Sequence, residues 1–432
     1  MTKDQICSSI ILAIKDYLST PSRLDAFKAP GRFVRKRLLS MLHVIIYLFF
    51  SDNPSMDTNL ANIKRELYGL VDFPQKITKQ AVSHARQAIN PMLFAELFNL
   101  SVDIFYQNTP KRNTWNGLHV FAIDGSKFEL PNSKKNFDHF GEMFKVSNPD
   151  SKFTQALASV VYDVLDDYIV HASIKRYLAS ERDSALLHLK TLEDLGIYEN
   201  SVIVFDRGYY SEAMFRYCVS HGHLCVMRLK DSMKFCKEIG KKVSDSVRTL
   251  HGNPKAGTED IPVRIISVKL DSGEYEYLAT NIFDTSFTTD MFRELYFLRW
   301  PIEVKYLELK ERLGIEDFNG ATPVSIIQEF YIKLLFSNLS ALIKSSADDI
   351  IDKNGKPTNK YRYQSNRSFV IGQIKTMFPR MVFGLRDITD TLDEILHDAA
   401  KAKSQIQPGR KFKRKEKKDK KRTHFRNRKP AY

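Results

Sequence analysis

The spacing of hydrophobic and polar positions changes along the chain, from a helical period in the first quarter to a strand pattern after it. Up to about residue 110, apolar residues recur three or four positions apart, as in segments 57–70 and 78–100. This spacing places one face of a helix against a core. Thr78 is a candidate N-cap for the second segment, because its hydroxyl can accept a hydrogen bond from a free N–H of the first turn. Residues 1–112 are therefore predicted to be helical.

The two predicted helices are joined by a short connection that contains VDFPQK. A helix, a short connection and a second helix with a polar outer face resemble a helix-turn-helix reader of DNA. The outward residues would be Lys79, Gln80, Ser83, His84, Arg86 and Gln87. The same pattern fits a helical bundle that acts as a scaffold, and the sequence leaves both interpretations open.

From about residue 115 the apolar residues form short runs that predict strands. The run that begins at His119 is apolar up to Asp124 and is expected to turn at Gly125. Residues 155–174 are predicted to form two strands joined by a tight turn at residues 166–167.

Helices and buried strands alternate in the next part of the chain. A helix is expected over residues 181–196, a short strand ending at Asp206, a helix over 211–222 and a strand over 223–230. The resulting order, β-β-β-α-β-α-β, is typical of a ribonuclease H-like α/β fold, in which helices flank a mixed sheet.

A block of about residues 231–288 interrupts this order before the next helix. Its alternating segment PVRIISVKL, the turn DSG and the segment EYEYLATNI predict a β-hairpin. We interpret the block as a β-rich insertion. After Gly320, further helical segments would cover the core. The expected parts of the chain are 1–112, 113–320 with the insertion at 231–288, 321–400, and a tail at 401–432.

The segment YFLRWPIEVKYLELKERLGIEDFNG, residues 296–320, has a chemically specific polar face. Relative to Glu303, Arg299 lies four residues back, Tyr296 seven back and Lys310 seven on. At about 100° per residue, these four side chains share a stripe about 60° wide, with Trp300 at its edge. The opposite, core-facing stripe consists of Leu295, Leu298, Ile302, Leu309 and Leu313.

Pro301 interrupts this pattern, because proline lacks an N–H and would kink a continuous helix. It could instead be the first residue of a helix, where proline is favoured. In both cases the positions of Tyr296 and Arg299 are less well defined than that of Lys310. Trp300 also has two interpretations, since it could stack on an unstacked base or pack against the core.

Composition adds a strong asymmetry of charge. The chain of 432 residues has a net charge of +15, but residues 401–432 hold 15 basic and only 2 acidic residues. The remaining 400 residues carry 51 basic and 49 acidic residues, so the body is close to neutral. A basic block of this kind is expected to be disordered and suits a polyanion such as nucleic acid. A tail that only improves solubility is the alternative.

Other features narrow the class of protein. The chain has four scattered cysteines and no run of eighteen apolar residues. We therefore expect a reducing, cytoplasmic compartment, no signal peptide and no membrane span. No glycine-rich phosphate loop appears, so no nucleotide cofactor is expected.

Three carboxylates are candidates for a metal site. Asp124 and Asp206 are each predicted to end an apolar strand, at the sheet edge where side chains meet in a crevice, and Glu303 comes from the helix beside them. Carboxylates without a His or Cys partner suit a hard cation such as Mg²⁺. Two such ions can activate a water and stabilise the leaving oxygen at a phosphodiester.

These residues carry a family resemblance. FAIDGSKFELP, VIVFDRGYYSEAMF and residues 296–320 resemble the three catalytic blocks of bacterial DDE insertion-sequence transposases. The third block matches the Tyr-x2-Arg-x3-Glu-x6-Lys signature of the insertion-sequence-four group. The second resembles that group's Asp, Gly and Tyr/Phe block at Asp206, Gly208 and Tyr209 or Tyr210. The resemblance covers roughly residues 60–380.

The resemblance implies a ribonuclease H-like catalytic domain that uses Mg²⁺, or Mn²⁺, to cut and join double-stranded DNA at terminal inverted repeats and in target DNA. It also implies that the element end closes transiently as a DNA hairpin and that the protein acts as a homodimer. A bacterial DNA transposase would be located in the cytoplasm, with the nucleoid. The catalytic and metal-binding residues would be Asp124, Asp206 and Glu303, and the phosphate contacts Tyr296, Arg299 and Lys310. Two alternatives stay open: a structure-specific DNA nuclease on the same fold, and a domesticated DNA-binding descendant.

Overall fold

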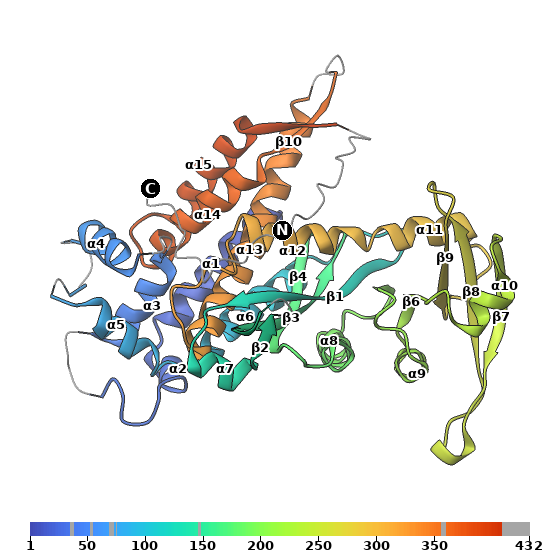
Figure 1. Ribbon diagram of the computed structural model, residues 1–432. Coiled ribbons are helices and arrows are strands. Elements are labelled where there is room, and N and C mark those ends of the chain that lie inside the picture. Colours follow the sequence, from blue (N-terminus) through green and yellow to red (C-terminus); the bar gives the residue numbers. More distant parts are fainter. Residues whose placement is uncertain are drawn as a thin grey trace. The chain divides into compact units, whose positions relative to one another are not determined.

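The computed structural model describes residues 1–34, 39–51, 55–68, 73–74, 76–145, 148–355 and 360–407 (Figure 1). The chain forms two compact units. The first unit contains residues 1–110, 128–156 and the chain from 308 onward, and the second contains residues 111–127 and 157–307. Three elements pass from one unit to the other: β1 (His119–Leu130), β3 (Asn148–Asp163) and α12 (Trp300–Glu311).

The first unit is mainly helical. Its other elements are α1 (Lys3–Leu18), α2 (Pro21–Asp25), α3 (Met41–Phe50), α4 (Met56–Glu66), α5 (Lys79–Arg86), α6 (Met92–Asn108), α7 (Lys134–Phe140), β2 (Met143–Lys145), α13 (Pro323–Lys353), β10 (Arg362–Ser365), α14 (Arg367–Val382), α15 (Ile388–Lys401) and β11 (Lys403–Ile406).

The long helix α13 forms the centre of the first unit. It packs against α1, α6, α14 and α15, so helices from both ends of the chain share one core (Figure 1). By length and composition α13 could cross a membrane, but 89% of its most apolar window is buried inside the protein, as in the core helix of a globular domain. The N- and C-terminal helical regions, expected as separate parts, therefore belong to one unit.

The outward face predicted for α5 is wrong at its C-terminal end, where Gln87 donates to Ser325 Oγ at 3.1 Å and Arg86 is buried. The hydroxyl of Thr78 caps α5 as expected, by accepting from the N–H of Ala81 at 3.2 Å. Arg86, predicted to point outward, is only 1% exposed, because its guanidinium forms an ion pair with Glu329 of α13 at 3.1 Å. The connection between α4 and α5 lies partly outside the described residues, so the helix-turn-helix interpretation stays a prediction.

The start of the basic tail also differs from the prediction. Lys401 ends α15, and β11 pairs with β10 in antiparallel register. The first residues of the tail predicted at 401–432 therefore belong to a helix and to a strand whose backbone pairs with β10. The basic block itself, from residue 408, lies outside the described residues.

The second unit contains the mixed sheet. Its other elements are β4 (Tyr168–Arg176), α8 (Glu181–Asp194), β5 (Ser201–Phe205), α9 (Glu212–Ser220), β6 (Leu224–Arg228), α10 (Lys234–Ile239), β7 (Ser244–Leu250), the 3₁₀-helix η1 (Pro254–Ala256), β8 (Ile261–Lys269), β9 (Tyr275–Thr280) and α11 (Thr289–Phe297).

The strand order of the sheet is β2-β3-β1-β5-β6-β9-β8-β7, and β4 also pairs with β3. β1, β5 and β6 run parallel, and β6 pairs with β9 in antiparallel register. All five residues of β5, SVIVF, are buried, as expected for a central parallel strand covered by helices on both faces. The mixed sheet and its order confirm the ribonuclease H-like fold class.

The insertion has its predicted hairpin, formed by β8 and β9 around the turn at residues 271–273. Its strands do not form a separate layer. Instead, β9, β8 and β7 continue the central sheet beyond β6 (Figure 1).

The segment around Pro301 forms two helices. α11 ends at Phe297 and α12 begins at Trp300, so Pro301 stands in the first turn of α12. This confirms the interpretation that the proline starts a helix, because its missing N–H costs nothing there.

Candidate active site

Asp124 and Asp206 come from neighbouring parallel strands. The register of β1 and β5 pairs Ile123 with Phe205, so the two aspartates are the next residues on adjacent strands, which run about 4.8 Å apart. The expected turn at Gly125 is wrong, because β1 continues through Gly125 to Leu130. Asp124 thus lies inside a strand, whereas Asp206 follows the end of one.

Asp124 is largely shielded from water. Burial raises the pKa of its carboxyl from 3.8 to about 7, against the opposing effects of the Gly125 N–H and of Arg299. The Gly125 N–H lies 2.9 Å from Asp124 Oδ1. The site therefore carries a carboxyl whose negative charge the protein compensates only in part.

The guanidinium of Arg299 forms ion pairs with both Glu303 and Asp124. Its Nη2 lies 2.6 Å from Glu303 Oε1, and its Nη1 lies 3.9 Å from Asp124 Oδ2. Burial alone would lower the pKa of Arg299, but Tyr296 and the neighbouring carboxylates outweigh it and raise that pKa. One buried guanidinium thus contacts two of the three candidate catalytic acids.

Tyr296 completes the contacts around Asp206. Its hydroxyl donates to Asp206 Oδ1 at 3.3 Å, and the guanidinium of Arg299 lies 5.8 Å from the centre of its ring. Three residues of the signature, Tyr296, Arg299 and Glu303, are therefore linked by successive contacts to Asp206 within the second unit.

Trp300 and Lys310 lie in different surroundings. Trp300 is 43% exposed, which disfavours the interpretation that it packs in the core. Lys310, on the last turn of α12, belongs to the first unit. There its Nζ lies 3.6 Å from Glu316 Oε1 and 5.1 Å from the centre of the Phe128 ring.

Three further side chains act on Asp124, and the sequence patterns indicated no role for two of them. Tyr306 donates its hydroxyl to the Asp124 carbonyl at 2.8 Å, and Glu181, at the start of α8, acts electrostatically on Asp124. Tyr209, already matched in the second block, is 1% exposed. The only sequence signal for Glu181 is Ser180, an N-cap that places the start of a helix there.

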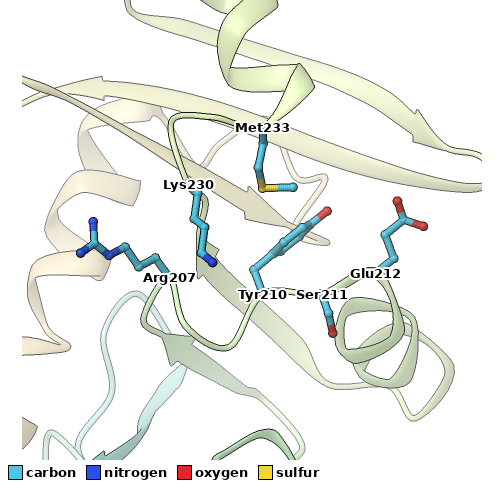
Figure 2. Close-up of a pocket in the computed structure, with 6 residues that line it drawn as sticks. All are labelled: Arg207, Tyr210, Ser211, Glu212, Lys230 and Met233. Atoms are coloured by element: carbon cyan, nitrogen blue, oxygen red, sulfur yellow. The ribbon is translucent and has the colours of Figure 1, made fainter.

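A pocket of about 320 Å³ is lined by Arg207, the residue after Asp206, and by residues 210–212, Lys230 and Met233 (Figure 2). Figure 2 shows Arg207 and Lys230 on one side of the Tyr210 ring, with Ser211 and Glu212 on the other. The Tyr210 hydroxyl is buried and has no hydrogen-bond partner among the described residues. Two cationic side chains next to a flat ring suit a phosphate and a base.

Comparison with known protein families decides the class. The family described as "Transposase DDE domain" matches residues 115–339, which include β1, β5 and α12 with their acids. The chain belongs to this family.

Two curated relatives of this DDE family member come from Escherichia coli (strain K12). It is 24% identical to transposase InsG for insertion sequence element IS4 over 275 residues, 61% of this chain and 60% of the relative. It is 24% identical to putative transposase InsZ over 136 residues, 32% of this chain and 44% of the relative. The matches thus span less than two thirds of either relative's length.

Among solved structures, this chain is similar to a chain in the cryo-electron microscopy structure of the piggyBac transposase synaptic complex with hairpin DNA. The two share 10% sequence identity with a TM-score of 0.47, over 93% of this chain and 85% of that chain.

The donor set of this DDE domain fits a hard divalent cation. In the described part of the chain, no three His, Cys, Asp or Glu side chains lie close enough together to hold a metal ion as they stand. The guanidinium of Arg299 lies between the carboxylates of Asp124 and Glu303. The candidate donors are carboxylate oxygens, which Mg²⁺ and Mn²⁺ prefer. The raised pKa of Asp124 points the same way, since a cation would supply the charge that the protein leaves uncompensated.

Proposed function

We propose that this protein is a DNA transposase that cuts and joins DNA at the terminal inverted repeats of an insertion sequence. The observation that carries the proposal is the pairing of Asp124 and Asp206 on adjacent parallel strands, with Glu303 linked to Asp124 through Arg299. Membership of the DDE transposase family supports the same reaction class.

In this proposal Asp124, Asp206 and Glu303 hold Mg²⁺ or Mn²⁺. When bound, the metal activates a water or a DNA 3′-hydroxyl and stabilises the leaving oxygen at a phosphodiester. Arg299 is positioned to exchange its carboxylate partners for a DNA phosphate, because a guanidinium binds both groups in the same forked geometry. The hydrogen bond from Tyr296 orients the Asp206 carboxylate.

Double-stranded DNA is the proposed partner, both as inverted-repeat ends and as target. Trp300 is exposed enough to stack on an unstacked base. Arg207, the residue after Asp206, and Lys230 line the pocket and would hold the backbone near the cut. Action as a homodimer and a place in the bacterial cytoplasm with the nucleoid belong to the same proposal.

The direct test is incubation of the purified protein with Mg²⁺ and a DNA that carries the inverted repeats flanking its gene. A transposase would produce both cleaved ends and products joined to a target plasmid. Cleavage without joining would favour a structure-specific nuclease, and binding without cleavage would favour a DNA-binding descendant.

Lys310→Ala should reduce cleavage by about tenfold or more, because a hydrogen bond to a charged group contributes roughly 1.5–3 kcal/mol. The measurement is the cleavage rate of end DNA at a fixed, subsaturating protein concentration. Lys353→Ala is the control, since Lys353 likewise lies in the last turn of a helix but is exposed. Equal effects of the two substitutions would mean that Lys310 acts only as a surface charge.

Truncation after Pro408 should weaken binding to random duplex DNA and make its dependence on salt shallower. Each phosphate contact contributes about −0.9 to the slope of log K against log salt, so even four lost contacts are measurable. Cleavage of ends bound at low salt should survive. An unchanged slope together with lost cleavage would instead assign the segment to the assembly of the active complex, which a sizing column would reveal.

A further inference from the structure

We propose that Glu181 is a fourth carboxylate of the divalent-cation site, acting beside Asp124 and Asp206. The inference rests on the proposed function and adds a ligand from α8, an element that none of the three sequence blocks contains. Its basis is the position of the Glu181 side chain, the packing around it and an unpartnered buried hydroxyl.

The Glu181 side chain lies against both segments that carry the aspartates. A Cβ placed on Gly125, the residue after Asp124, would meet Glu181 Cγ at 3.4 Å. A Cβ placed on Gly208, two residues after Asp206, would lie 3.9 Å from Glu181 Oε2. The stem of the glutamate thus passes over Gly125, and its carboxylate reaches toward the loop after β5.

The surrounding contacts hold Glu181 in this position. Ser180 caps α8 by accepting from the Asp183 N–H at 3.1 Å, which fixes the first turn. Arg182 donates to the carbonyl of Gly208 at 3.2 Å and to that of Tyr210 at 3.0 Å. These bonds tie the start of α8 to the loop that follows Asp206.

The Tyr209 hydroxyl is a second, independent observation at this cluster. It is buried and has no hydrogen-bond partner within the described part of the chain. Burial raises the pKa of this phenol well above its ordinary value, and Asp124 and Glu181 raise it further, which places the hydroxyl among the acids. The neighbouring Ser159 hydroxyl is engaged with the Asp124 carbonyl and with His188. A water bound to a cation would satisfy the phenol.

Charge balance favours a fourth acid. Asp124, Asp206, Glu303 and the phosphodiester supply four negative charges, whereas two divalent cations and the Arg299 guanidinium bring five positive charges. Among the residues that the structure describes, Glu181 forms no ion pair and no hydrogen bond through its carboxylate. It is therefore free to bind a cation without first losing a partner.

The test compares Glu181→Gln with Asp183→Asn in the full-length protein. Both acids lie in the first turn of α8 and interact similarly with the helix dipole, but Asp183 is exposed. Mn²⁺ binding is measured by calorimetry and by electron paramagnetic resonance, with and without duplex DNA, and metal-free melting checks that each variant folds. Glu181→Gln should raise the Kd for Mn²⁺ by about tenfold or more, and Asp183→Asn should leave it near that of the wild type.

Asp206→Ala separates this inference from the proposed function. If Asp206→Ala loses Mn²⁺ binding and cleavage while Glu181→Gln binds Mn²⁺ like Asp183→Asn, the role of Glu181 is overturned and the proposed function stands. If Asp206→Ala keeps both properties, the proposed function fails as well. A wild-type protein that binds no Mn²⁺ in either condition would also overturn the inference.

Discussion

Asp206→Ala should abolish DNA strand cleavage, with a loss on the order of 10³-fold or more. The substitution removes the carboxylate next to Asp124, and losing a bound metal costs several kcal/mol of transition-state charge stabilisation. Binding of end DNA should persist, because phosphate contacts supply most of the affinity and no positive side chain is lost. The two measurements are the cleavage rate with Mg²⁺ and the retention of labelled DNA.

Asp194→Ala is the control for this experiment. Asp194 ends α8 in the same unit, and its side chain is 65% exposed in a pair with Lys190, so its loss should not affect cleavage. Asp206→Ala protein that cuts its ends at the wild-type rate would remove Asp206 from the active site.

Arg86→Ala should destabilise the first unit by about 3–5 kcal/mol, because it leaves the buried carboxylate of Glu329 without its charged partner. The guanidinium also donates to Gln328 Oε1 at 3.1 Å and to the Ser325 carbonyl at 3.2 Å, and these acceptors lose their donor too. The effect would appear as a lower midpoint of unfolding by heat or urea.

Two variants test the cause of this loss. Arg386→Ala breaks an exposed pair with Glu394 and should cost no more than about 1 kcal/mol. Replacing both Arg86 and Glu329 by methionine should recover part of the stability, because no buried charge is left alone. A single Arg86→Ala variant as stable as Arg386→Ala would contradict the importance of the buried pair.

Local patterns predicted the elements that place the aspartates. The apolar run before Asp206 and the helical period after it are properties of a few consecutive residues, and β5 and α9 follow them closely. Strand order then brought Asp124 and Asp206 to neighbouring strands, as the ribonuclease H-like arrangement requires.

Predictions that depended on distant residues were less successful. Gly125 suggested a turn, but the structure gives it another function. It leaves room for Leu157 and Glu181, which a Cβ would approach at 3.2 and 3.4 Å, and a glycine within a strand often marks such a close approach. Arg86 looked like an outward cation because its partner, Glu329, lies more than 240 residues away in sequence. Neither contact leaves a periodic signal.

The continuity of the sheet through β9, β8 and β7 limits how far this chain can be shortened. β6 is shielded on that side by β9, and its Val226 and Met227 are fully buried. Excising residues 231–288 would leave β6 as an open edge with apolar side chains, which is a template for intermolecular pairing. The insertion is therefore not a removable module, and a minimal catalytic domain without it would be expected to aggregate.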